Sequence, residues 1–470
     1  MSSNNNRPSS LRPFGLRDKI GYMFGNFGND FTFVFASSFL MIFYTKVLGV
    51  SGGMVGTLFL VSRILDAFTD ITMGRIVDTA KPAKDGRFRP WIRRVCVPVT
   101  VASFLMYQYG VADWPMWAKI VYIYVTYLVW GSIFYTGINI PYGSMASVIS
   151  SDAGDRASLS IFRNLGTTLA NLMIGVGVPL IVYTSDAQGN QVAVPERFTL
   201  IAGIFAVLSL ICYILCYKLC VERVQVSKVE KEKAQSPKEL IASIGKNRAL
   251  LAIIGAAMAS LLAMFLVTSM NNYVYLDYFK DKNMLSIVTL VMTGVSLAIA
   301  PFSTAIAKKF GKKESGAVAL IITAITYFVM YVLRTESAVV FIVLTGVSYI
   351  GVAYFNMIIW AYITDVIDYQ EVLTYKREDG TVYAVYSFAR KVGQALAGGI
   401  GGFALELIAY DSSAVAQTAE VNGKIYTVST IFPAIFYLIV ALILISFYPL
   451  SKKIVEQNVE ELKRRHEQQN

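Results

Sequence analysis

The sequence predicts an all-α membrane protein of twelve transmembrane helices in two six-helix halves, with both termini in the cytoplasm. Three observations lead to this fold class. Of the 470 residues, 55% are hydrophobic and only 16% are charged, and no water-soluble core of this size requires such a composition. Twelve apolar runs are long enough to cross ~30 Å of hydrocarbon at ~1.5 Å per residue. Lys and Arg are concentrated in alternate loops, which fixes the orientation.

The expected spans follow one another closely along the chain. Several exceed the ~20 residues that a spanning helix needs, so tilt or extension into the cytoplasm is expected. We place the spans at 20–47, 53–77, 91–111, 119–148, 160–183, 197–220, 249–279, 285–307, 316–333, 338–364, 383–409 and 427–449.

Basic residues mark the cytoplasmic loops. The chain start, the second, sixth and eighth loops and the tail are basic, whereas the loops between them carry few Lys or Arg. Twelve helices with both ends inside fit this pattern, and most of the net charge of +11 arises from it. A nucleic-acid partner is therefore not needed to explain the charge. The basic segments include Arg12 and Lys19, 81–89, 228–238, 308–313 and 463–465.

The polar segment after the sixth span divides the chain into two halves. The basic loop "DGRFRP" (85–90) has a counterpart in "FGKKES" (310–315), about 225 residues later. Two six-helix halves built from smaller repeats are typical of a transporter that rocks about a midplane site. We expect a cytoplasmic segment at 1–19, a six-helix bundle at 20–220, a linker at 221–248, a second bundle at 249–449 and a tail at 450–470.

The remaining sequence features predict no cofactor and no cleaved leader. The first eighteen residues are polar and the first apolar run is too long for a signal peptide. Cys212, Cys216 and Cys220 form a stripe at helical spacing, but the single histidine, His466, lies in the tail. Packing is therefore favoured over a metal or redox site for these cysteines.

Two carboxylates lie within the second span, "LVSRILDAFTDITMGRIV" (60–77). A charge at mid-membrane costs about 2.5–3.5 kcal/mol, so such groups face a partner or a water-filled cavity. Asp66 and Asp70 lie on one helix face, about 6 Å apart along the axis. With hydroxyls such as Thr69 or Thr136 they could replace the hydration shell of a small hard cation. The alternative is a salt bridge to Arg63 or Lys391, which would need only one acid.

A third acid and a set of aromatic residues indicate a sugar site. Asp30 lies near the centre of the first span, and a carboxylate can accept hydrogen bonds from several sugar hydroxyls. Arg163 could donate to the same ring, or could instead extend to the interface. Aromatic rings on the fourth, tenth and eleventh spans could stack on the sugar or simply pack. They include Trp130, Trp360 and Tyr386.

Four motifs carry a family resemblance over nearly the whole chain. They are "GNFGNDF", "VGTLFLVSRILDAFTDITMGRIVD", "TYLVWGSIFYTGINIPYGSM" and "DVIDYQEVLTYKREDGTVYA". The sequence resembles the glycoside–pentoside–hexuronide:cation symporters, the group of the melibiose permease within the major facilitator superfamily. The resemblance implies the major facilitator fold and symport of a glycoside with a cation by alternating access.

The resemblance also implies roles for single residues in cation coupling. Asp66 and Asp70 match the sodium-binding acids of the permease, and Thr136 matches a third oxygen ligand. Thr69 stands where the permease has Asn, and a hydroxyl is a weaker ligand than an amide oxygen. Lys391 matches a lysine beside the cation site. We expect sodium to be the coupling ion ahead of protons.

The resemblance covers the sugar pocket only in part. Asp30 and Arg163 match pocket residues, but the second sugar-binding Asp of the permease is Asn139 here and its stacking Trp is Gly143. Loss of that charge and that aromatic ring disfavours an α-galactoside. The stretches "DITMGRIVDTAKPAKDGRFRPWIRR" and "INIPYGSMAS" are closer to the xyloside and glucuronide branch. We expect a β-xyloside or xylo-oligosaccharide, with glucuronides next and galactosides after them; Trp130 and Tyr386 are further candidate pocket residues.

Other classes of function fit less well. A proton-driven drug exporter would need an apolar pocket with one acid, and a membrane sugar sensor would carry an added signalling domain. An enzyme is not expected, because neither a nucleophile–base pair nor a metal cluster is visible. We expect a bacterial multi-pass protein of the cell membrane that works as a monomer, with the sugar, the coupling ion and the lipid bilayer as its partners.

Overall fold

The computed structural model describes residues 12–80, 83, 85–224, 247–375 and 379–469, and these form two compact units. The first unit comprises Met1–Phe43, Leu65–Ile174 and Pro195–Glu232, and the second comprises Tyr44–Ile64, Gly175–Val194 and Lys233–Asn470. Two segments of the expected first bundle thus belong to the second unit, because they contact its helices. Most of the expected linker at 221–248 and of the N-terminal segment lies outside the described residues.

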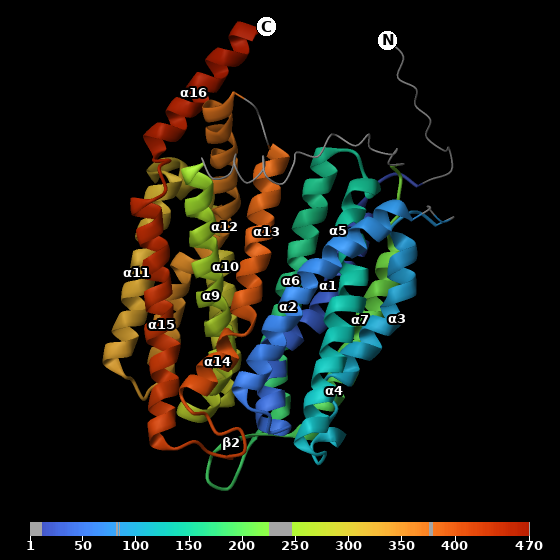
Figure 1. Ribbon diagram of the computed structural model, residues 1–470, viewed down its shortest axis with the longest axis vertical. Coiled ribbons are helices and arrows are strands. Elements are labelled where there is room, and N and C mark those ends of the chain that lie inside the picture. Colours follow the sequence, from blue (N-terminus) through green and yellow to red (C-terminus); the bar gives the residue numbers. More distant parts are fainter. Residues whose placement is uncertain (1–11, 81–82, 84, 225–246, 376–378, 470) are drawn as a thin grey trace. The chain divides into compact units, whose positions relative to one another are not determined.

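The first unit is built around α1, which packs along α7, while α3 packs against α7 and α5. Its helices are drawn in blue to green in Figure 1. They are α1 (Leu16–Phe35), the π-helical turn η1 (Ala36–Leu40), the second part of α2 (Gly52–Thr79), α3 (Arg89–Leu105), the short 3₁₀ turn η3 (Tyr109–Val111), α4 (Met116–Leu128), the π-helical η4 (Val129–Tyr135), α5 (Thr136–Ile149), most of α6 (Ala153–Val182) and α7 (Pro195–Leu219).

The second unit packs α15 against α9 and α11, and α12 against α10 and α11. It also contains the π-helical turn η2 (Phe43–Val47), the first part of α2 and the hairpin β1–β2 (Tyr183–Ser185, Gln191–Ala193). The remaining elements are α9 (Arg248–Tyr273), the π-helical η5 (Val274–Tyr278), α10 (Lys282–Phe310), α11 (Lys312–Leu333), α12 (Ala338–Thr374), α13 (Asp379–Gly398), α14 (Ile400–Leu407), α15 (Ala419–Ser446) and α16 (Lys452–Gln469).

Every expected span coincides with a helix or a helical run. Eight of the described helices are long and apolar enough to cross a membrane. The other four expected spans correspond to α1, α2, α3 and the α13–α14 run, which are helical but shorter or more polar. They carry the charged residues that the sequence places inside spans, for example Asp66 and Asp70 on α2 and Arg390 and Lys391 on α13.

Three features were not expected from the sequence. The helix α12 continues ten residues past the span expected at 338–364, and its extension carries Asp365, Asp368 and Glu371. The hairpin turns through Gly189 at φ +80°, and the Asp186 carboxylate accepts the backbone N–H groups of Gln188 and Asn190. The tail forms α16, which packs on the end of α12.

Glycines bring α2 into direct backbone contact with the α13–α14 junction. A Cβ on Gly56 would lie 2.8 Å from the carbonyl oxygen of Gly399, and one on Gly402 would lie 2.3 Å from that of Gly52. No side chain fits in this space, so these positions require glycine. The contact explains why the first part of α2 belongs to the second unit.

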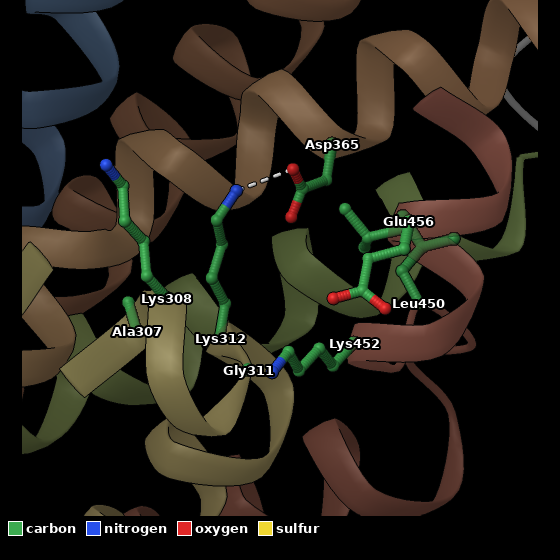
Figure 2. Close-up of a pocket in the computed structure, with 9 residues that line it drawn as sticks. Ala307, Lys308, Gly311, Lys312, Asp365, Leu450, Lys452 and Glu456 are labelled. Atoms are coloured by element: carbon green, nitrogen blue, oxygen red, sulfur yellow. Dashed lines mark hydrogen bonds and ion pairs between the residues drawn. The ribbon is translucent and has the colours of Figure 1, made fainter. Parts of the chain in front are cut away.

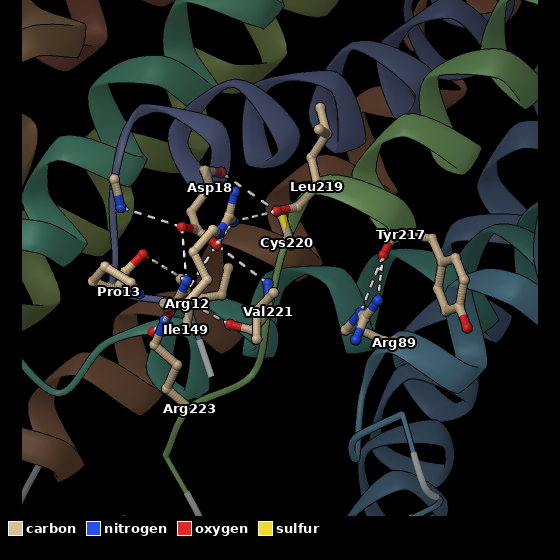
Figure 3. A network of polar contacts seen from close by, with 11 residues as sticks. Arg12, Pro13, Asp18, Arg89, Ile149, Tyr217, Leu219, Cys220, Val221 and Arg223 are labelled. Carbon is tan, nitrogen blue, oxygen red and sulfur yellow. Dashed lines mark hydrogen bonds and ion pairs between the residues drawn. The ribbon is translucent and has the colours of Figure 1, made fainter. Parts of the chain in front are cut away.

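A buried carboxylate ties the start of α1 to the end of α7 (Figure 3). Asp18 is fully buried, and its carboxylate lies 3.0 Å from the Arg12 guanidinium and 2.9 Å from that of Arg223. Both guanidinium groups also donate to backbone carbonyls, Arg12 to Leu219 and Arg223 to Pro13 and Ile149. Because all of these groups are satisfied within the protein, we interpret this network as structural.

Candidate functional site

Asp66 and Asp70 of α2 face the hydroxyl groups of Ser132 and Thr136, which lie in the helical run of η4 and α5. The Ser132 hydroxyl donates to Oδ1 of Asp66 at 2.6 Å, and the Thr136 hydroxyl donates to Oδ1 of Asp70 at 3.0 Å. Asp66 and Asp70 are four residues apart, and so are Ser132 and Thr136. The two carboxylate–hydroxyl contacts therefore lie about one helical turn apart, like two rungs of a ladder. We call Asp66, Asp70, Ser132 and Thr136 the acid–hydroxyl ladder.

The local backbone explains the close approach in this ladder. Ser132 lies in the π-helical segment η4 and Thr136 is the first residue of α5. A Cβ on Gly131 would lie 3.8 Å from Oδ1 of Asp66, an ordinary contact distance, so the backbone of η4 passes close to this carboxylate. The ladder thus offers carboxylate and hydroxyl oxygens, which are the ligands that hard cations prefer.

The other two residues expected at the cation site are Thr69 and Lys391. The Thr69 hydroxyl donates to the carbonyl oxygen of Asp66 at 3.2 Å within α2. Lys391 lies on α13 in the second unit and is exposed. In the described part of the chain there is no group of three or more His, Cys, Asp or Glu residues that could hold a metal ion. The described hydrogen bonds of this region thus bring together two carboxylates and two hydroxyl groups.

Asp30 is the centre of a second polar cluster in the first unit. It is 9% exposed, and its Oδ2 accepts a hydrogen bond of 2.6 Å from the amide of Asn26. The same amide nitrogen lies 2.6 Å from the Thr167 hydroxyl, and Oδ1 of Asn26 accepts from Nε of Arg163 at 3.0 Å. Asn26 thus bridges the carboxylate and the guanidinium between α1 and α6.

Asn139 and Gly143 lie on α5, which contacts α1. The Asn139 Oδ1 accepts from the amide of Asn29 at 3.3 Å, and Oδ1 of Asn29 accepts from the Tyr213 hydroxyl at 2.7 Å. Gly143 is exposed, and no described atom lies within 4 Å of the position that its Cβ would occupy.

The two candidate aromatic residues are both packed. Trp130 is 2% exposed between Tyr127 and Tyr135, with ring centroids 5.6 and 5.3 Å away. Its indole N–H has no acceptor within the described residues. Tyr386, in the second unit, is 1% exposed and meets Trp360 edge to face at 5.5 Å.

Two buried acids of the second unit are paired with lysines. Lys46 forms a buried ion pair with Asp277, whose other carboxylate oxygen accepts from the Tyr410 hydroxyl at 2.9 Å. Lys312 forms an ion pair of 2.6 Å with Asp365. We call these two contacts the lysine–acid pairs.

The second pair borders a cavity of about 150 Å³ (Figure 2). The cavity lies between the start of α11, the polar part of α12 and the start of α16, and Lys308, Lys452 and Glu456 line it. It is smaller than the ~300–1,000 Å³ typical of small-molecule sites. Its acid Asp365 is paired with Lys312.

The sequence analysis did not identify several residues that form hydrogen bonds or ion pairs with the site residues. For some of them, the helical spacing in the sequence was an available indication. Ser132 precedes Thr136 by four residues, so the spacing of the two acids could have identified it. Asn26 precedes Asp30 by the same interval on α1. Thr167 and Lys46 had no comparable signal, because their partners are far away in the sequence.

Comparisons with known proteins agree with this picture. Residues 21–452 match the family described as MFS/sugar transport protein. The chain is 30% identical to the "Uncharacterized symporter YjmB" of Bacillus subtilis, over 95% of each chain. It is also 30% identical to the "Glucuronide carrier protein homolog" of Escherichia coli, over 96% of each chain. The crystal structure of a D-xylose-proton symporter is similar in fold, with a TM-score of 0.65 at 13% identity over 93% of this chain and 98% of that one.

Proposed function

The chain belongs to the MFS/sugar transport protein family, and we propose that this multi-pass transporter moves a glycoside into the cell together with a cation. One relative is named a symporter, which supports coupled entry, and another is named a glucuronide carrier, which supports a sugar as the substrate. The single observation that carries the proposal is the acid–hydroxyl ladder of Asp66, Asp70, Ser132 and Thr136.

The coupling ion we propose is sodium, with the proton as the alternative. Two carboxylates and two hydroxyls supply several oxygens in one place, which suits a partly dehydrated sodium ion. Thr69 is a weaker contributor, because its hydroxyl already donates within α2. A role for Lys391 in coupling is proposed from the family resemblance alone.

For the sugar, we propose that Asp30 and Arg163 bind ring hydroxyls. Asn26 already holds both groups in one cluster, so a sugar can bind them without first assembling the site. Asn139 and the open space at Gly143 then shape the rest of the pocket in the first unit. The sequence favours a β-xyloside, and the glucuronide carrier among the relatives favours an acidic sugar.

The test is uptake of labelled glycosides into proteoliposomes under imposed gradients. A sodium gradient at fixed pH is compared with a pH gradient in the absence of sodium, for a xyloside, a glucuronide and a galactoside. We expect the sodium gradient to drive accumulation of the xyloside, the glucuronide or both. Uptake driven by the pH gradient alone would make Asp66 and Asp70 a proton-carrying pair. Sugar binding without uptake would indicate a sensor and overturn the proposal.

We further propose that the protein resides in the bacterial cell membrane and works as a monomer. The measurement is the mass of the purified protein in detergent at concentrations that support sugar binding. A dimer that binds one sugar per two chains would contradict the proposal.

A further inference from the structure

Asn26 lies between the two charged residues of the proposed sugar pocket. It is 4% exposed on α1, four residues before Asp30. Its amide nitrogen donates to Oδ2 of Asp30 and to the Thr167 hydroxyl, each at 2.6 Å, and its Oδ1 accepts from Nε of Arg163 at 3.0 Å. The buried amide is therefore satisfied by one acidic, one neutral and one basic partner.

The backbones of α1 and α6 approach closely beside this amide. A Cβ on Gly166 would lie 2.9 Å from the carbonyl oxygen of Met23. Gly166 lies between Arg163 and Thr167 on α6, so the close approach brings both of these residues to Asn26. Since a larger residue at Gly166 would push the two helices apart, the backbone itself sets the place of the amide.

Asp30 and Arg163 do not pair with each other directly. In the described part of the chain no ion pair joins their side chains, and the Asn26 amide stands between them. Arg163 also lies over the ring of Tyr142, at 5.8 Å from the ring centroid. Its two terminal nitrogens have no hydrogen-bond partner among the described residues, so their N–H donors remain available.

An arginine and an aspartate at this separation attract each other where the dielectric constant is low. A direct pair would occupy the donors and acceptors of both groups, and a sugar hydroxyl would then have to break it. An amide prevents this pairing, because its oxygen accepts from a guanidinium while its nitrogen donates to a carboxylate. A carboxylate only accepts and an ammonium only donates, so neither could serve both partners.

We infer that Asn26 is a positioning residue, which keeps Asp30 and Arg163 from pairing with each other and leaves both of them open to sugar hydroxyls. The inference rests on the proposed function for the sugar-binding roles of Asp30 and Arg163. It adds that the affinity for the sugar depends on a residue that acts through these two. Loss of the amide should let the long side chain of Arg163 reach the carboxylate.

The first experiment measures this pairing without any sugar. The melting temperature of the purified protein is recorded for Arg163→Gln made in the unmodified protein and made in Asn26→Ala. We expect the larger fall in Asn26→Ala, because there the change leaves the buried Asp30 without the ion pair that has formed. An equal or smaller fall would mean that no direct pair forms, and would overturn the inference.

The second experiment measures binding of methyl β-D-xyloside and methyl β-D-glucuronide by calorimetric titration. Asn26→Ala should weaken binding about tenfold. When Arg163→Gln is already present, the same change should weaken binding less than about twofold, because no guanidinium is left to pair with Asp30. A general structural role for Asn26 would give equal losses in both backgrounds, and that result would also overturn the inference.

The matched control is Asn171→Ala on α6. The Asn171 amide donates to the carbonyl oxygen of Thr167 within its own helix, at 2.8 Å, so its loss should leave the affinity for the sugar unchanged. If it weakens binding as much as Asn26→Ala does, loss of any amide in this region disturbs the pocket and the inference falls. If the unmodified protein binds neither sugar, the proposed substrate class fails, and the melting temperatures alone decide whether Asn26 separates the two charges.

Discussion

Asp30, Asp66 and Asp70 in the first unit differ in their described hydrogen-bond donors from Asp277 and Asp365 in the second unit. Asp18 of the first unit, which pairs with Arg12 and Arg223, resembles the acids of the second unit. In the first unit, Asp66 and Asp70 meet the hydroxyls of Ser132 and Thr136, and Asp30 meets the amide of Asn26. In the second unit, Asp277 and Asp365 are paired with lysines. A hydroxyl or amide donor adds no positive charge beside a carboxylate, whereas a lysine does.

This difference between the donors indicates which acids bind ligands and which acids stabilise the fold. A carboxylate held by neutral donors can attract a cation or a sugar hydroxyl, at the cost of burying a charge. A lysine–acid pair has no net charge with which to attract a ligand. Removing one of its two residues leaves the other as a buried charge without a partner. We therefore expect changes in the first unit to alter transport and equivalent changes at the lysine–acid pairs to alter stability.

The largest effect is expected in the acid–hydroxyl ladder. Asp66→Cys and Asp70→Cys each remove a charged oxygen ligand, so both should abolish sugar accumulation against a gradient while leaving some sugar binding or exchange. The measurement is accumulation and exchange of labelled glycoside in the same vesicles. Asp113→Cys, which changes an exposed acid outside the helices, is the control. Full accumulation in both ladder variants would remove the ladder from coupling.

The next effect concerns the stability of the second unit. Lys46→Met leaves the buried carboxylate of Asp277 without its lysine, and removal of one partner of a buried pair typically costs about 3–5 kcal/mol. We expect a marked fall in the melting temperature of the purified protein. The double change Lys46→Met with Asp277→Leu should recover most of that loss. If the single change leaves the melting temperature unaltered, the pair does not stabilise the unit.

A smaller effect is expected at the sugar pocket. Asp30→Ala removes an acceptor for a sugar hydroxyl, which is worth about 1–3 kcal/mol, or about a 5- to 150-fold loss of sugar affinity. Sodium binding should persist, since the ladder is intact. Calorimetric titration of the purified variant with sugar and with sodium separates the two. Unchanged sugar affinity would give Asp30 a structural role.

The smallest effect tests the neutral rungs of the ladder. Ser132→Ala and Thr136→Ala each remove one hydroxyl oxygen, and each should weaken sodium binding about tenfold, equivalent to about 1.4 kcal/mol. Ser147→Ala on α5 is the matched control, because its hydroxyl donates within its own helix to the carbonyl of Ser144 at 2.8 Å. If all three variants bind sodium alike, the carboxylates act without the hydroxyls.

The sequence predicted the helices well because apolar runs and loop charges are local signals. It also placed Asp66 and Asp70 on one face, since a spacing of four is a property of the helix itself. Lys46 and Asp277 are 231 positions apart in the sequence, so no local sequence pattern predicts their ion pair. The π-helical turns were not predicted, because one extra residue in a helical turn does not interrupt the apolar run from which the helix is predicted. The last ten residues of α12 were not predicted as helix, because acidic residues in that stretch are also typical of a loop.

A sodium ion bound at the acid–hydroxyl ladder has an electrical consequence that depends on the charge of the sugar that enters with it. A sugar with one carboxylate and one sodium ion together carry no net charge, so their entry is electroneutral and the membrane voltage does not drive it. A neutral glycoside entering with one sodium ion would instead gain about 2.3 kcal/mol for each 100 mV. A cell with a collapsed voltage but an intact sodium gradient would thus still accumulate the acidic sugar, and would lose most of its capacity to concentrate a neutral one.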